Sequence, residues 1–147
     1  MILLDANILV YALDATTAMH APSLTVMTAA VNGRVPAVLV PQVLLECFSA
    51  ATRGPHGVPP RDMLAQIAFW RANIPVLDVK AQVIEEFERI VSHTPRTGGA
   101  VYDLFLVAQM RTHGVREICT YNIRDFQLPG VRAYTPQQAL AGPRVRR

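Results

Sequence analysis

The chain begins with Met1-Ile-Leu-Leu-Asp-Ala-Asn7, a short apolar run that ends on a carboxylate. Residues 2–4 have the composition of a buried strand, and residues 8–13 read as a short helix that Asn7 could cap. Short apolar strands followed by helices are typical of a parallel sheet covered on both faces. The opening stretch therefore predicts an α/β fold with an acidic side chain, Asp5, at the end of its first strand.

The same alternation of strands and helices continues along the chain. Further strands are expected at residues 38–40, 76–79, 118–120 and 131–133, and further helices at 22–32, 41–52, 61–72, 80–92, 100–113 and 136–140. No repeat, low-complexity tract or long linker divides these elements. We therefore predict a single domain over residues 1–147, with a basic tail at about 142–147. Its expected fold is a three-layer α/β/α sandwich around a mainly parallel sheet.

The composition restricts the class of protein. Hydrophobic residues make up 51% of the 147 residues and charged residues 17%, which excludes a disordered chain. No stretch of about 18 apolar residues could span a bilayer, and Asp5 interrupts the first apolar run, so we expect a cytoplasmic protein without a membrane partner. Cys47 and Cys119 lack zinc-binding spacing and are expected to be buried thiols. The net charge of +3 suits a polyanionic partner without requiring one.

Three of the eleven acidic residues lie in apolar surroundings, where an ionised group is costly unless something binds it. Asp5 ends the first strand, and ligands of open parallel sheets bind outside the carboxyl ends of strands. Glu46 and Asp103 each project from a largely apolar helix face without a basic neighbour on that face. The remaining acids fall on polar helix faces, in first helical turns or near element ends.

Two explanations of these three acids remain open at this point. Each could cap a helix, accept from a backbone amide or pair with an arginine distant in sequence. For all three together this explanation is weaker, because helix interiors offer few free amide donors. Clustered carboxylates raise one another's pKa unless a divalent cation compensates, and oxygen ligands without histidine favour Mg²⁺, with Mn²⁺ as a substitute.

The order and spacing of four segments resemble the PIN-domain ribonucleases, and most closely the VapC toxins of bacterial toxin–antitoxin pairs. The segments are Asp5-Ala-Asn7, Glu46 in a central helix, Asp103 in Tyr-Asp-Leu-Phe-Leu-Val-Ala, and Thr120-Tyr-Asn-Ile-Arg-Asp-Phe126. The likeness covers essentially the whole chain. It implies a PIN-like nuclease domain and a Mg²⁺-dependent endoribonuclease acting on RNA, which would form a homodimer and be inhibited by a cognate antitoxin.

The resemblance also implies the residues of the site. Asp5, Glu46 and Asp103 match three acidic positions of the family and are expected to be catalytic, with Asp5 and Asp103 as metal ligands. Two residues are candidates for the fourth position. Many family members have an acid where this sequence has Asn122, and others have an Asn-x-x-acid arrangement like the one that ends here on Asp125. We expect Asp125 to be the fourth catalytic acid. Other expected site residues are Asn7, Thr120 and Asn122, which would line the pocket, and Arg96 and Arg124, which would bind RNA phosphates.

Several other functions are compatible with the sequence. With Asn122 in place of an acid, the chain could be an RNA-binding module without catalysis. It could also be a DNA nuclease or a housekeeping nuclease outside any toxin pair, since a carboxylate site does not itself choose between sugars. A small-molecule phosphatase would use Asp5 as a nucleophile, but such enzymes typically carry a second acid two residues on, where this chain has Asn7.

Overall fold

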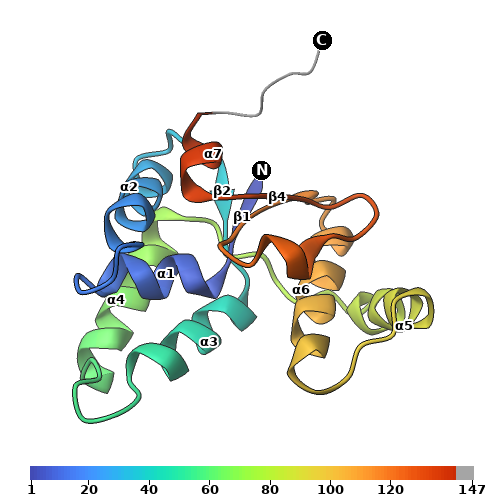
Figure 1. Cartoon of the computed structure of the whole chain (residues 1–147), viewed down its shortest axis with the longest axis horizontal. Helices are drawn as coiled ribbons and strands as arrows, with labels where there is room; N and C mark the ends of the chain where they lie inside the picture. The colour runs from blue at the N-terminus through green and yellow to red at the C-terminus, as the bar shows by residue number, and fades with distance from the viewer. Residues whose placement is uncertain (142–147) are drawn as a thin grey trace.

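Four parallel strands form the sheet at the centre of the protein. The structure is a computed structural model and describes residues 1–141, so the basic tail predicted at about 142–147 lies outside the described residues (Figure 1). The strands are β1 (Ile2–Leu4), β2 (Ala37–Val38), β3 (Glu117–Cys119) and β4 (Arg132–Tyr134), in the order β2-β1-β3-β4. Ile2 pairs with Ala37 on one side and with Glu117 on the other. Because all pairs are parallel, the four carboxyl ends share one edge of the sheet.

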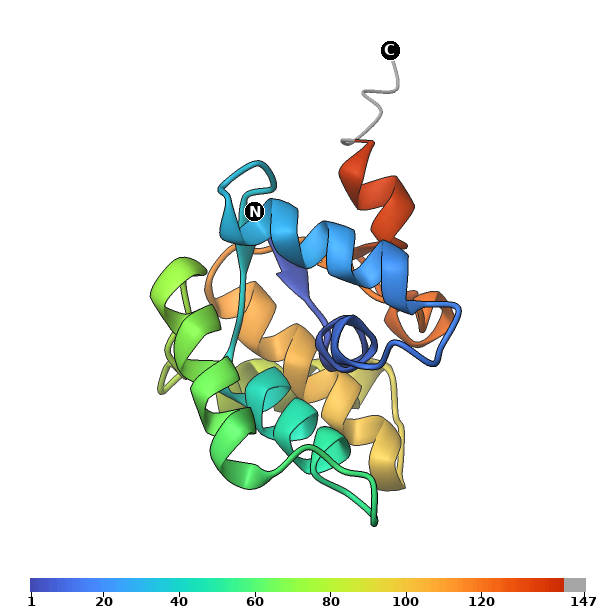
Figure 2. The same ribbon diagram turned by 90° about the vertical axis from the view of Figure 1, so that its left-hand side faces the viewer.

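Helices cover both faces of this sheet, as the alternation predicted. The α-helices are α1 (Ala6–Leu13), α2 (His20–Val31), α3 (Pro41–Ala51), α4 (Pro60–Asn73), α5 (Val83–His93), α6 (Val101–Thr112) and α7 (Pro136–Leu140), with 3₁₀ turns η1 (Gly98–Ala100) and η2 (Ile123–Phe126). Helices α1 and α2 lie on one side of the strands and α5 and α6 on the other (Figure 1). Figure 2 shows α1 and α2 in front of the strands and α6 behind them. The predicted α/β sandwich with a parallel sheet is therefore confirmed.

The central strands are buried on both faces. Leu3, Leu4 and Ile118 expose 1% or less of their surface, which explains why β1 is a continuous apolar run and why Ile118 and Cys119 of β3 are both apolar. Trp70 of α4 joins the same core. Cys47 and Cys119 are buried free thiols, as expected, and burial raises the pKa of each to about 12.

The expected N-cap of the first helix was wrong. Helix α1 begins at Ala6 and its N-cap is Asp5, whose side chain accepts from the Ala6 amide. The side-chain amide of Asn7 points instead to Asp5 and Thr120, because these acceptors lie at the strand ends beside it.

The strand expected at residues 76–79 is also absent from the described sheet. Val76 forms an isolated parallel bridge with Leu39, through hydrogen bonds from Leu39 N to Pro75 O and from Leu77 N to Leu39 O. Without further pairing the apolar run does not become a strand. The following helix also begins at Val83 rather than at residue 80.

None of the helices in residues 1–141 is long and apolar enough to cross a membrane.

Candidate functional site

Asp5 lies at the carboxyl edge of the sheet, between the ends of its two central strands. Its backbone amide donates to Cys119 O at 3.0 Å, which continues the pairing of β1 with β3 by one residue. Its carboxylate accepts three hydrogen bonds, from Ala6 N at 2.7 Å, from Asn7 Nδ2 at 2.8 Å and from Thr120 Oγ1 at 2.6 Å. The side chain is therefore held in one orientation, with the side chains of Asn7 and Thr120 beside it.

The electrostatic environment of Asp5 is unfavourable for its negative charge. The pKa of Asp5 is raised from 3.8 to about 6, mainly by burial; the carboxylates of Glu46 and Asp103 contribute to the rise, and the hydrogen bonds from Thr120 and Ala6 oppose it. Hydrogen bonds thus compensate only part of the cost of burying the charge. An ionised Asp5 is a group that a bound cation would stabilise.

Asp103 faces the same region from the first turn of α6. Its side chain is 32% exposed, and its pKa is raised by burial, by Asp125 and by Glu46, and is lowered by Arg96. Arg96 Nη1 lies 3.9 Å from Asp103 Oδ2. Arg96 is seven residues away in sequence, so this pairing depends on the turn of η1 and not on helix periodicity.

The other two acids reach the site from α3 and η2. Glu46 is partly buried and influences the pKa of both Asp5 and Asp103. Asp125 is exposed and acts on the pKa of Asp103. Glu46 and Asp103 therefore lie near enough to Asp5 to raise its pKa, and Asp125 lies near enough to Asp103 to do the same there. Asn122 lies in the same loop, where its backbone amide donates to Thr120 Oγ1 at 2.9 Å.

The positions and chemistry of the acidic side chains can be compared with what a bound divalent cation requires. Within residues 1–141, no group of three or more acidic, histidine or cysteine side chains lies close enough to surround one ion. The chemistry of the donors nevertheless fits a hard divalent cation, since four carboxylates share one region and the most buried of them, Asp5, is incompletely compensated. The candidate ligands are therefore identified by charge and chemistry and not by a closed coordination sphere.

The two predicted arginines differ in position. Arg96 lies beside Asp103 with 21% of its side chain exposed, whereas Arg124 is exposed on η2 and forms no ion pair within the part of the chain that the structure describes. Both stand at the rim of the acidic region, on the segments that carry or precede Asp103 and Asp125.

Two further residues escaped the sequence analysis. Gln42 of α3 donates to Glu46 Oε1 at 2.7 Å, and Gln109 of α6 donates to Gln42 Oε1 at 2.7 Å. The spacing of Gln42 and Glu46, four residues apart on one helix, was a signal for their contact. Gln109 gave a weaker signal, as a polar residue within the apolar run that follows Asp103.

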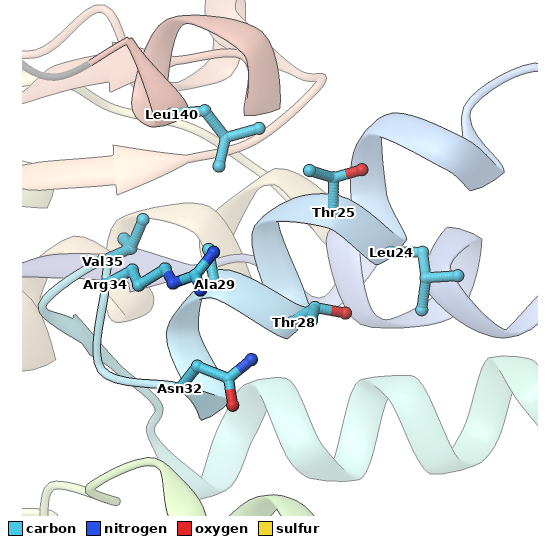
Figure 3. A pocket seen from close by; sticks show the side chains of 8 residues that line it. All are labelled: Leu24, Thr25, Thr28, Ala29, Asn32, Arg34, Val35 and Leu140. Carbon is cyan, nitrogen blue, oxygen red and sulfur yellow. The ribbon is translucent and has the colours of Figure 1, made fainter.

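A surface pocket lies away from the four acids. A pocket of about 490 Å³ is bordered by α2 and α7, with Leu24, Arg34 and Leu140 among its lining residues (Figure 3). None of the four acids lines this pocket. The chemistry of the acidic region, and not the size of a cavity, therefore identifies the candidate site.

The comparisons with known proteins concern the family and the fold. The family model described as the PIN domain matches residues 2–129. No curated protein sequence matches the chain.

Several solved structures share the fold. VapC20 of Mycobacterium tuberculosis, described as a sarcin-ricin loop cleaving toxin, has a TM-score of 0.65 at 20% identity, over 90% of this chain and 99% of that one. DNA-bound VapBC from Salmonella typhimurium has a TM-score of 0.66 at 19% identity, over 92% and 99% of the two chains. VapBC2 from Rickettsia felis, bound to a promoter DNA fragment, has a TM-score of 0.66 at 16% identity, over 92% and 98%. At these identities the likeness concerns the fold.

Proposed function

The chain belongs to the PIN domain family, and on that premise we propose that it is a metal-dependent endoribonuclease, the toxin of a VapBC-type toxin–antitoxin pair. One observation carries the proposal. Asp5 is buried at the carboxyl edge of the sheet, its pKa is raised to about 6, and Glu46 and Asp103 contribute to that rise. A bound cation would stabilise these neighbouring carboxylates in their ionised form, and an acidic site with a divalent cation suits phosphodiester hydrolysis.

Each site residue has a distinct role in this proposal. Asp5 and Asp103 would hold Mg²⁺, for which Mn²⁺ could substitute, and Glu46 and Asp125 would complete the acidic set. A divalent cation in this set would lower the pKa of a water molecule and stabilise the charge of the leaving oxygen.

The uncharged residues of the site keep Asp5 in place. Thr120 and Asn7 orient Asp5 through the hydrogen bonds described above, so that its carboxylate stays at the strand edge. Asn122 would line the site around these acids, from the loop that carries Asp125.

The substrate proposed is single-stranded RNA. Arg96 and Arg124 stand at the rim of the acids, where they can bind the phosphates that flank the scissile bond. The description of one solved relative as a toxin that cleaves the sarcin-ricin loop supports RNA as the substrate class. Unpaired bases offer their edges to side chains, so specificity would come from contacts with unstacked bases around the site.

The partners proposed are an antitoxin and a second copy of this chain, in the cytoplasm. Solved structures with this fold include toxin–antitoxin complexes, which supports an antitoxin as the inhibitor. Expression of the chain should arrest growth, and coexpression of a small protein encoded beside it should relieve the arrest. Growth without arrest, at equal amounts of soluble protein, would favour a housekeeping nuclease instead.

Cleavage by the purified protein tests the enzymatic part of the proposal. Matched single-stranded RNA and DNA are incubated with Mg²⁺ or with EDTA, and the products are resolved by size. We expect cleavage of RNA only with Mg²⁺, and its loss in Asp5→Asn and Asp103→Asn. Asp62→Asn, which changes an exposed acid in the first turn of α4, is the control and should cleave like the wild type. Undiminished cleavage in both site variants would reject the site.

One observation favours a second function. Asn122 stands where many family members place an acid, and no three acids among residues 1–141 surround one point, so the site could bind RNA without cleaving it. In that case gel-shift assays would show RNA binding that EDTA does not abolish, with intact RNA recovered afterwards.

A further inference from the structure

Two glutamines connect the helices that carry Glu46 and Asp103. Gln42 Nε2 on α3 donates to Glu46 Oε1 at 2.7 Å and to the carbonyl oxygen of Tyr102 at 3.0 Å, one residue before Asp103. Gln42 Oε1 accepts from Gln109 Nε2 on α6 at 2.7 Å. A single side chain, Gln42, therefore contacts one acid directly and the backbone beside another.

The hydrogen-bonding partners determine the orientation of both amides. A carboxylate and a backbone carbonyl only accept, so the two contacts with Glu46 and Tyr102 require the NH₂ group of Gln42. The oxygen of Gln42 then faces Gln109, which must present its own NH₂ group. Turning either amide over would bring two oxygens or two NH₂ groups into contact at 2.7 Å. The series of hydrogen bonds through Glu46, Gln42 and Gln109 therefore has only one arrangement. The carboxylate of Glu46 determines the orientation of the Gln42 amide, and this amide determines that of Gln109.

This arrangement has a cost within the core. Gln109 exposes 1% of its surface, and its Oε1 has no hydrogen-bond partner among the described residues. A buried oxygen without a donor is unfavourable for folding. Methionine or leucine at this position of an apolar helix would avoid the cost, so stability does not explain the glutamine. The hydrogen bond from Gln109 to Gln42 explains why a glutamine stands at this position.

We propose that Gln42 and Gln109 are positioning residues, which set the distance between Glu46 and Asp103 and so prepare the acids to bind a divalent cation. The inference rests on the proposed function and deepens it, because it says how helices α3 and α6 are held in register at the site. Gln42 acts through Glu46, and Gln109 acts through Gln42. Partners of this kind around metal-binding carboxylates are commonly worth 10- to 100-fold in affinity or activity.

Methionine substitutions test the inference, since methionine keeps the length of glutamine and removes its amide. Mn²⁺ affinity of the RNA-free protein is measured by electron paramagnetic resonance, together with thermal unfolding without metal and kcat and KM for RNA cleavage. For Gln109→Met we expect unfolding at the same or a higher temperature, because the unpaired oxygen is gone. We also expect about tenfold weaker Mn²⁺ binding and a fall in kcat that exceeds any rise in KM.

The same experiment includes a control and a test of coupling. Gln66→Met makes the same chemical change on α4, at a partly buried glutamine outside the network, and should bind Mn²⁺ like the wild type. Gln42→Met should weaken Mn²⁺ binding at least as much as Gln109→Met. The double variant should be no worse than Gln42→Met alone, because the two amides act in series.

The outcomes separate this inference from the proposed function. Wild-type Mn²⁺ affinity and kcat in both glutamine variants would overturn the inference alone. So would losses found only in variants that unfold at lower temperature, since the amides would then be structural. Weakened Mn²⁺ binding in a protein whose wild type cleaves no RNA would support the positioning role and overturn the proposed nuclease. A wild type that binds no Mn²⁺ would overturn both.

Discussion

Thr120 Oγ1 donates a 2.6 Å hydrogen bond to Asp5 Oδ2, across 115 residues of sequence. The bond joins the ends of β1 and β3 and lowers the pKa of Asp5 against the effect of burial. The threonine thus helps to keep a buried carboxylate ionised at the pH at which it would bind a cation.

Thr120→Val should therefore shift the pH dependence of activity. Valine keeps the shape of threonine but removes the donor, so the pKa of Asp5 should rise above about 6. The acidic limb of the profile of kcat/KM against pH should move to higher pH, with the largest loss of cleavage near pH 6 and a smaller loss near pH 8. Thr28→Val, on the exposed side of α2, is the control. An unmoved acidic limb would contradict this role of Thr120.

Asp5→Asn should stabilise the metal-free protein above pH 6. The pKa of Asp5 is raised from 3.8 to about 6 by folding, so the folded state binds more protons than the unfolded state in this interval. Stability should consequently fall as pH rises from about 4 to 6, by at most about 3 kcal/mol. Urea unfolding in EDTA should show this fall in the wild type and a flatter dependence in Asp5→Asn. An equal fall in both proteins would assign the pH dependence to other groups.

Mg²⁺ should raise the unfolding temperature of the wild type, because an ion that binds only the folded state stabilises it. At a hundredfold excess over its dissociation constant the gain is about 2.7 kcal/mol. Calorimetry with Mg²⁺ and with EDTA should show this shift, and Asp103→Asn should lose most of it. The control variant Asp62→Asn should keep it. Equal shifts in all three proteins would mean that Mg²⁺ acts on the general surface charge.

The fourth acid can be assigned by exchanging residues within one loop. Asp125→Asn should lower RNA cleavage by about 10- to 100-fold, since Asp125 adds negative charge near Asp103. Asn122→Ala should have a smaller effect. Adding Asn122→Asp to the Asp125→Asn variant should restore part of the activity, if either position can supply the charge. Full activity in Asp125→Asn would exclude this residue from the site.

Arg96→Ala should weaken RNA binding and its dependence on salt. Loss of one phosphate contact should reduce the slope of log affinity against log salt concentration by about 0.7 for single-stranded RNA. Fluorescence anisotropy at several salt concentrations, with Ca²⁺ in place of Mg²⁺, measures this slope. Arg61→Ala, at the exposed start of α4, is the matched control. Identical slopes for both variants and the wild type would show that Arg96 binds no RNA phosphate and serves only as the ion-pair partner of Asp103.

Local patterns in the sequence were sufficient to predict the central strands and the helices that follow them. β1 and the Ile118-Cys119 part of β3 were recognisable because strand residues buried on both faces are apolar in succession, and Asp5 stood out because it interrupts such a run. The segment around Val76 was misjudged, since an apolar run becomes a strand only if a neighbour offers it a continuous set of hydrogen bonds. The cap of α1 was misassigned by two residues, because Asp5 and Asn7 are both good caps and the choice depends on where Thr120 lies.

The sequence by itself determined the α/β class, the position of Asp5 at a strand end and the candidate acids, because these follow from composition and local periodicity. Only the tertiary structure decided which side chains meet. Arg96 reaches Asp103 through a turn, and Gln42 meets Gln109 from a position 67 residues away. Such contacts depend on how α3 and α6 pack against the sheet, which no local pattern records. The distance between the acids, on which metal binding depends, is likewise a property of that packing.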